Sequence, residues 1–210
     1  MLGIQCKIKA VVLCGGQSSR MGTAKHKLQF SNGRPIYEYL VSQILQAVPT
    51  VEDICISVRS GDAHVDGPIP AVDGRPLRQV LDADSEPQIG PAAGLLAAYR
   101  HDVGAHWLVV ACDYPLMSAI ELRRLVASYT QPLTCFENKD GWAEPLLAIW
   151  SPEALDLLRD NVSKGITGPQ REVRSLQGKR IQPCDQRSLL NTNTPSEWRK
   201  ALDMAREMTI

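Results

Sequence analysis

The residues with the clearest chemical pattern lie between positions 13 and 25, directly after an apolar run. Gly15 and Gly16 follow Leu13 and Cys14, and glycines allow backbone N–H groups to approach an anion closely. The residues that follow supply hydroxyl donors and fixed positive charge at four positions: Ser18, Ser19, Arg20 and Lys25. This stretch predicts a loop that binds phosphate, with a glycine-rich turn carrying solvated charges as the alternative.

The spacing of this loop does not fit two common phosphate-binding motifs. A Walker loop has Lys directly after its second glycine, whereas Thr23 follows Gly22 here. The adjacent pair Gly15–Gly16 also differs from the GxGxxG pattern of dinucleotide-binding proteins. Both features disfavour the common kinase and dehydrogenase loops.

A single carboxylate follows a second apolar run. Residues 107–113 read WLVVACD, so Asp113 lies where a buried strand would end. Mg²⁺ shared with nucleotide phosphates suits such a carboxylate, because Mg²⁺ prefers one or two carboxylates together with phosphate and water oxygens. The alternative is an aspartate that only begins a turn.

Two amides precede a predicted helix near the C-terminal end of the sequence. Asn191 and Asn193 come just before Thr194, which is followed by Pro195 and Glu197 in the pattern of a capping box. One asparagine can cap locally while the other reaches a ligand or a metal-bound water. The pattern leaves both roles open.

These candidate residues need a scaffold that brings them together, and the chain alternates apolar runs with helical patterns. Five short runs are typical of strands buried on both faces: 8–13, 54–58, 107–111, 133–136 and 146–150. An apolar stripe from Ile36 to Val48 predicts a helix, Ser118 with Glu121 predicts a capping box, and Ser151 begins another helix.

This order of elements predicts an α/β fold of Rossmann-like type, a mainly parallel sheet with helices on both faces. Ligands of such sheets bind at the carboxyl ends of the strands. The predicted phosphate-binding loop at residues 13–25 (the glycine loop) and Asp113 both fall at such ends.

Composition narrows the class of protein. With 210 residues and 44% hydrophobic content, the chain can form one full core, and we expect residues 1–210 to be a single domain. Its 23 cationic and 23 anionic side chains disfavour nucleic acid or an anionic membrane as a partner. No stretch approaches the roughly 20 apolar residues of a membrane helix, and no signal peptide is recognisable, so we expect a cytoplasmic protein. The six cysteines lack a CxxC pair and are expected to be buried thiols rather than disulfides or zinc ligands.

Five segments together resemble a known family. They read LCGGQSSRMGTAK, IGPAAGLLAAY, VVACDYP, EPLLAIW and NTNTP. In order and spacing they are similar to the nucleotidyltransferases typified by the molybdenum cofactor guanylyltransferase, over nearly the whole chain. The resemblance implies a fold of the nucleotide-diphospho-sugar transferase type. It also implies Mg²⁺-dependent transfer of a nucleoside monophosphate from a nucleoside triphosphate to a phosphorylated acceptor, with release of pyrophosphate; in the type family these are GTP and molybdopterin.

The resemblance also assigns roles to residues of the glycine loop. The nucleotide-binding backbone of the family falls on four residues: Leu13, Cys14, Gly15 and Gly16. Its arginine falls on Arg20, and the lysine that neutralises the triphosphate falls on Lys25, with Lys27 as a competitor.

Two further positions correspond to aspartates of the family. The aspartate that binds base or ribose corresponds to Asp82, with Asp84 as a possible substitute. Asp113 matches the metal-binding aspartate and would also touch the nucleotide. Arg20, Lys25 and Asp113 are therefore the expected catalytic residues, which offset charge repulsion while an acceptor phosphate oxygen attacks the α-phosphorus.

Two departures from the family bear on specificity. The segment ICISVRS places Ser57 and Arg59 where guanylyltransferases often carry asparagines, so GTP is favoured without excluding other nucleotides. Glu144 occupies a position where molybdopterin enzymes often have His or Gln, and with Asn191 and Asn193 it is the expected acceptor side. A carboxylate there could repel a phosphate, bind a second metal or recognise a cationic acceptor.

Two alternatives to a molybdopterin enzyme follow. The same chemistry could use CTP or another nucleotide with a sugar phosphate or small alcohol phosphate. A catalytically silent nucleotide-binding module that regulates a partner is the alternative from a different class.

Overall fold

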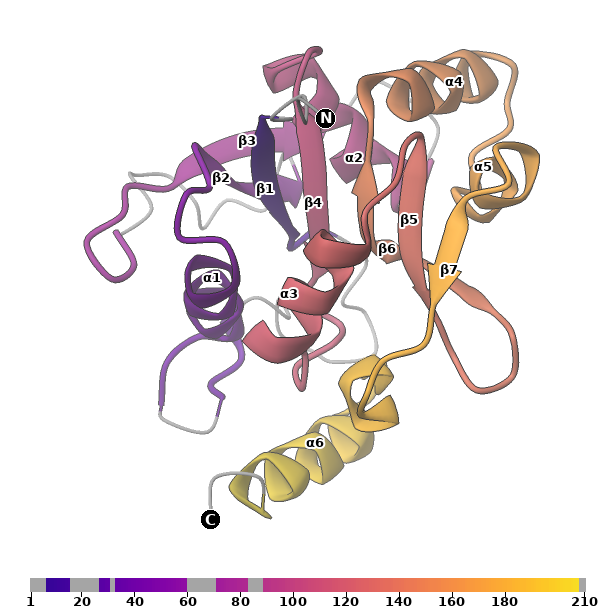
Figure 1. Cartoon of the computed structure of the whole chain (residues 1–210). Coiled ribbons are helices and arrows are strands. Elements are labelled where there is room, and N and C mark those ends of the chain that lie inside the picture. The colour runs from indigo at the N-terminus through magenta and orange to yellow at the C-terminus, as the bar shows by residue number, and fades with distance from the viewer. Residues whose placement is uncertain (1–6, 16–26, 31–32, 60–70, 83–88, 208–210) are drawn as a thin grey trace.

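The computed structural model describes residues 7–15, 27–30, 33–59, 71–82 and 89–207, and these form a seven-stranded sheet (Figure 1). Its strand order is β3-β2-β1-β4-β6-β5-β7. The strands are β1 (Ile8–Leu13), β2 (Ile54–Arg59), β3 (Arg78–Asp82), β4 (His106–Ala111), β5 (Leu133–Glu137), β6 (Ala143–Trp150) and β7 (Lys179–Ile181).

The sheet is mainly parallel, as predicted. Four neighbouring pairs run parallel, while β6 is antiparallel to both β4 and β5. The reversal follows from the connection, because residues 138–142 join β5 to β6 in a hairpin closed by the bond from Asn138 N to Trp142 O (2.9 Å). Such a link is too short for the crossover that a parallel pair requires.

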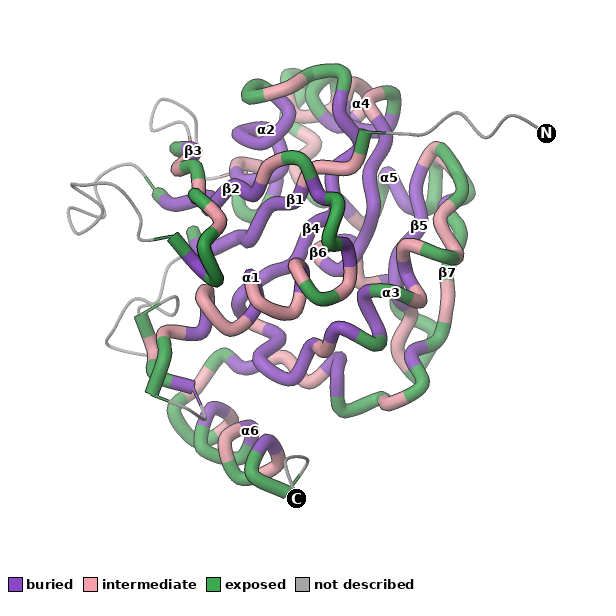
Figure 2. The backbone as a smooth tube through the Cα atoms, turned by 60° about the vertical axis from the view of Figure 1, so that its left-hand side comes forward, coloured by how far each residue is buried: buried purple, intermediate pink, exposed green. Residues whose placement is uncertain are grey.

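Helices cover both faces of the sheet. They are α1 (Ile36–Ala47), α2 (Ala92–His101), α3 (Ala119–Ser128), α4 (Pro152–Ser163), α5 (Gln170–Ser175) and α6 (Pro195–Glu207). Helices α1 and α3 lie on one face, and α2, α4 and α5 lie on the other (Figures 1 and 2). Helix α6 extends away from the sheet and packs through Trp198 against the segment that precedes α1, where the Trp198 ring lies 6.0 Å from that of Phe30.

The core lies between these layers, in the purple segments of Figure 2. Every residue of β4 is buried, and β1 is buried from Ala10 onward. Central strands covered by helices on both faces lose the alternation of polar and apolar residues, which explains why Ala10–Leu13 and Trp107–Ala111 are continuously apolar. None of the helices in the described part of the chain has the length and apolar character needed to cross a membrane.

Three helix starts predicted from the sequence have their caps. Ser151 Oγ accepts a hydrogen bond from Ala154 N (3.3 Å), and Thr194 forms a full capping box with Glu197. At α3, Ser118 Oγ accepts from Glu121 N (3.4 Å), but the second half of the predicted box is wrong. The Glu121 carboxylate instead accepts a hydrogen bond from the distant backbone N–H of Asp185 (2.9 Å).

Candidate active site

The candidate site lies at the carboxyl ends of the central strands. From β1 the chain order proceeds to β2 and β3 on one side of the sheet, and β4 lies on the other. The strand order therefore reverses between β1 and β4, and such a switch point is where open α/β sheets bind ligands. The glycine loop follows β1 and Asp113 follows β4, as the sequence predicted.

Hydrogen bonds hold the ends of β1, β2 and β4 side by side. Cys112 donates to Leu13 O from its backbone N (3.1 Å) and from its thiol (2.8 Å). Cys14 N donates to Ser57 O (2.8 Å). Burial raises the pKa of the Cys14 thiol well above its usual value, and the adjacent Cys112 thiol adds to this effect, so Cys14 serves as a neutral packing group. Asp113 leaves the sheet next to the start of the glycine loop.

The end of β3 brings a carboxylate to the same place. The Ser57 hydroxyl donates to Asp82 Oδ1, and the other oxygen of Asp82 lies so close to Gly15 that a side chain there would overlap it. Gly15 thus leaves the space that the Asp82 carboxylate occupies, and a side chain at position 15 would have to displace that carboxylate. The structure thus brings together Gly15 and Asp82, two of the residues that the resemblance assigned to nucleotide binding.

The first turn of α2 closes this group from one side. A Cβ added to Gly94 would lie 2.8 Å from Leu13 Cδ2, 2.8 Å from Ser57 Oγ and 3.6 Å from Asp82 Oδ1. The absence of a side chain at Gly94 is what allows the helix to approach the strand ends. Helix α2 begins at Ala92, directly after the Gly90–Pro91 pair that the sequence analysis placed at a helix entry.

The asparagine segment is attached to the loop that carries Asp113. Thr192, which is fully buried, donates to Asp113 O from its backbone N (2.8 Å) and from its hydroxyl (3.2 Å). Asn193 Nδ2 donates to Asn191 Oδ1 (2.7 Å), so the two amides form one unit beside Asp113. The N–H of Asn193 bonds to the Glu197 carboxylate (2.7 Å), so the cap of α6 also fixes this segment.

A second carboxylate is linked to Asp113 through its neighbour Tyr114. The Tyr114 hydroxyl donates to Glu144 Oε2 (2.7 Å), and Asn138 Nδ2 lies 3.4 Å from Glu144 Oε1. Asn191 also hydrogen-bonds to the Tyr114 side chain. Burial raises the pKa of the Glu144 carboxyl against the lowering effect of these two hydrogen bonds, and burial together with Glu144 raises the pKa of Tyr114. The acceptor-side residues predicted from the sequence are thus connected to one another.

Several predicted site residues lie outside the described part of the chain: Gly16, Arg20, Lys25 and Asp84. Lys27 is described and exposed. The roles assigned to Arg20 and Lys25, and the choice between Lys25 and Lys27, stay predictions.

Two residues of this site were not singled out as site residues from the sequence. Tyr114 directly follows Asp113, and an aromatic hydroxyl beside a candidate metal ligand was the available signal. Thr192 lies between the two asparagines, but nothing in its local sequence indicates that it bonds to the backbone of a residue 79 positions earlier.

Comparisons with known proteins show which proteins this chain is similar to. A sequence profile described as the MobA-like NTP transferase domain matches residues 10–182. A molybdenum cofactor biosynthesis bifunctional protein from Synechocystis sp. is 27% identical over 92% of the chain, but the chain spans only 53% of that relative. A molybdenum cofactor guanylyltransferase from Yersinia pestis is also 27% identical, with 92% of the chain and 94% of the relative covered.

A solved structure extends the likeness to three dimensions. A nucleotidyl transferase from Methanothermobacter thermautotroptrophicus is 22% identical and superimposes with a TM-score of 0.74, covering 96% of this chain and 99% of the other. This likeness confirms the predicted α/β fold.

Proposed function

Because the chain belongs to the MobA-like NTP transferase family and carries a nucleotidyltransferase domain, we propose that it transfers GMP from GTP to molybdopterin. One observation carries this proposal. The carboxylate-bearing loop at Asp113 leaves the sheet beside Cys14 and Gly15 at the switch point, and Asp82 reaches Gly15 from the next strand end. This is the arrangement that a nucleotide with a metal-bound triphosphate would need.

The proposed roles follow from position and chemistry. Asp113 supplies the oxygen ligand that suits Mg²⁺, which when bound would neutralise charge on the triphosphate. Leu13, Cys14 and Gly15 are proposed to line the nucleotide with their backbone; because Leu13 O and Cys14 N are bonded to Cys112 and Ser57, the contacts would come from the other backbone groups of this stretch. Asp82, oriented by Ser57, offers a carboxylate to base or ribose. Gly16, Arg20 and Lys25 complete this proposal through the family resemblance.

The acceptor side is proposed at Glu144, Asn191 and Asn193. Next to Glu144, Ala143 lines a cavity of about 340 Å³ together with Arg174 and Arg180. Arg180 is already paired with Glu137 (2.7 Å), so Arg174 is the lining arginine proposed to bind a phosphorylated acceptor, because Arg matches the geometry of phosphate oxygens. Glu144, held by Tyr114, would then face a part of the acceptor other than its phosphate.

We take residues 1–210 as one domain, supported by the continuous seven-stranded sheet of the described residues. We place the reaction in the cytoplasm, supported by the free thiols of Cys14, Cys55, Cys112 and Cys135, since a reducing compartment keeps buried thiols reduced.

The test is release of pyrophosphate with Mg²⁺, with each nucleoside triphosphate tried against molybdopterin and a panel of phosphorylated sugars and alcohols. We expect release to require GTP and molybdopterin together. We also expect Asp113→Asn to lower turnover by about 100-fold or more, the scale of removing one preorganised electrostatic group. Asp140→Asn, at an exposed carboxylate of the β5–β6 hairpin, is the matched control and should leave turnover unchanged.

Each other outcome is informative. Release with a different nucleotide and acceptor would replace the proposed substrates while keeping the reaction. Binding of GTP without release against every acceptor would favour the regulatory module. Full activity of a folded Asp113→Asn protein would refute the proposed role of this carboxylate.

A further inference from the structure

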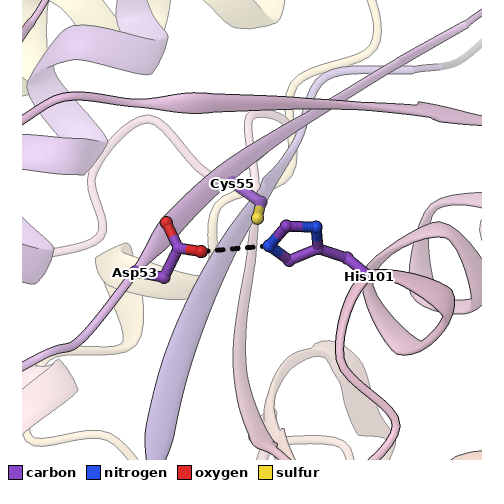
Figure 3. A group of neighbouring side chains, drawn as sticks. All are labelled: Asp53, Cys55 and His101. Atoms are coloured by element: carbon purple, nitrogen blue, oxygen red, sulfur yellow. Dashed lines mark hydrogen bonds and ion pairs between the residues drawn. The ribbon is translucent and has the colours of Figure 1, made fainter.

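A second group of potential ligands lies at the amino ends of the parallel strands, opposite the candidate active site. Asp53 directly precedes β2, Cys55 lies within it and His101 is the last residue of α2 (Figure 3). One donor atom from each residue, a carboxylate oxygen, Cys55 Sγ and a ring nitrogen, lies within 4.8 Å of the other two. His101 Nε2 is 3.0 Å from Asp53 Oδ2.

Strand periodicity and the length of α2 together create this group. Side chains at positions i, i+2 and i+4 of a strand share a face, so Asp53, Cys55 and Ser57 point toward the same layer. Helix α2 packs on that face: its first turn meets Ser57 through Gly94, and its last residue reaches Asp53. The helix thus spans from the candidate active site to this group.

We propose that Asp53, Cys55 and His101 bind a Zn²⁺ ion, with water as the fourth ligand. Thiolate, imidazole and carboxylate are the donors that proteins use for zinc, and hard cations such as Mg²⁺ disfavour sulfur. Metal–ligand bonds of about 2.0–2.3 Å place tetrahedral ligands roughly 3.3–3.8 Å apart. Side-chain movements of about 1 Å therefore convert the observed cluster into a zinc site.

The surrounding charges are compatible with a bound dication. Asp53 also contacts Arg78 (3.0 Å) and Lys9 (3.9 Å), which compete for its carboxylate. The Arg78 side chain is 65% exposed, so its guanidinium can rotate into solvent and free the Asp53 carboxylate for a metal. Lys9 keeps a closer partner in Asp102 (2.8 Å).

Cys55 would change its protonation state on binding. Burial, followed by the charge of Asp53, raises the pKa of this thiol to about 12, so it is neutral without a metal. Zinc binding forms a sulfur–zinc bond and releases the thiol proton to water, with no change in oxidation state. The His101 ring is 29% exposed, which leaves a path for the ion and the water.

Equilibrium titration of the purified, tag-free and chelator-treated protein with Zn²⁺ and Co²⁺ tests the proposal. We expect one Zn²⁺ per chain, a thiolate-to-cobalt charge-transfer band and a higher Tm with Zn²⁺. Loss of a residue that only hydrogen-bonds to a metal ligand costs about 10–100-fold in metal affinity. Cys55→Ala and His101→Gln each remove a direct ligand, so each should weaken Zn²⁺ binding by about 100-fold or more. Cys135→Ala removes an equally buried thiol on β5 and should leave the affinity for Zn²⁺ and the cobalt band unchanged.

Two controls separate metal binding at this group from binding near Asp113 and from loss of folding. Because Cys14 and Cys112 lie near Asp113, the titrations are repeated in Asp113→Asn, where the cobalt band should persist. His101→Gln alters a partly exposed side chain and should stay folded even if Cys55→Ala does not. Binding that survives both Cys55→Ala and His101→Gln, or a wild-type protein without a cobalt–thiolate band, would overturn the proposal. Either result is independent of the proposed transferase activity.

Discussion

Replacing Gly94 by alanine tests whether close packing of α2 on the strand ends holds the candidate site together. Helix propensity alone predicts a gain of about 1 kcal/mol in the free energy of unfolding, because glycine disfavours a helix by that amount relative to alanine. The structure predicts the opposite sign. The new Cβ would lie 2.8 Å from both Leu13 Cδ2 and Ser57 Oγ, which belong to different strands and cannot both be relieved by one rotamer change.

The expected magnitude follows from these two opposing terms. Overpacking a well-filled core costs about 1–3 kcal/mol, and two simultaneous close contacts place Gly94→Ala near the middle of that range. After subtraction of the propensity gain, we expect a net loss of about 1 kcal/mol, or a Tm lower by roughly 2–4 °C for a protein of this size. Nucleotide binding should weaken as well, because Ser57 orients Asp82.

Urea unfolding followed by circular dichroism measures the first effect, and titration with GTP measures the second. Gly168→Ala is the matched control, since nothing lies within 4 Å of a Cβ added there and its backbone needs no positive φ. That control should stay within about 0.5 kcal/mol of wild type or gain slightly. A Gly94→Ala protein that is more stable than wild type and binds GTP normally would refute the packing argument.

Three further predictions concern titration and capping. Burial raises the pKa of Glu144, so the contribution of this carboxyl to stability is full below its unfolded pKa and is lost as pH rises through its folded pKa. Glu144→Gln should therefore reduce the loss of stability between acid and neutral pH. Identical urea midpoints at every pH in the variant and the wild type would contradict this. Ser151→Ala removes the oxygen that accepts a hydrogen bond from Ala154 N, so the free energy of unfolding measured in urea should fall by about 1 kcal/mol. An unchanged free energy of unfolding would show that this cap contributes nothing to stability. The hydrogen bond from Lys9 lowers the pKa of Asp102, so the contribution of this carboxylate to stability is present above its unfolded pKa and is lost as pH falls through its folded pKa. Asp102→Asn should lower the free energy of unfolding by up to about 1 kcal/mol at neutral pH and make its decrease in acid less steep. An unchanged dependence of stability on pH in acid would argue against the ion pair.

Local patterns were sufficient for the central elements. Ile8–Leu13 was predicted with the bounds that β1 has, because its buried part, Ala10–Leu13, is the kind of apolar run found in strands covered on both faces. The cap of α4 at Ser151 was equally readable, since a capping side chain bonds to backbone only three residues away. Asp113 and the glycine loop were placed at strand ends for the same reason: the run of apolar residues stops there.

The weaker elements were not visible in the sequence. Strand β3 reads RQVLD and lies at the sheet edge with mixed exposure, and β7 has three residues. Neither has the apolar length that marks a buried strand. The reversed direction of β6 was also missed, because an apolar run has the same appearance in either direction.

The assembly of the site depended on strand order and register. Ser57 meets Asp82 because β2 and β3 are neighbours with Arg59 opposite Asp82, and Glu144 meets Tyr114 because β6 returns beside β4. Asp53 and His101, 48 residues apart, meet because α2 ends over the start of β2. Side-chain types and local periodicity identify which residues can bind or react. Which of them touch is decided by contacts between distant segments, whose energies arise only when the sheet has formed and its helices have packed.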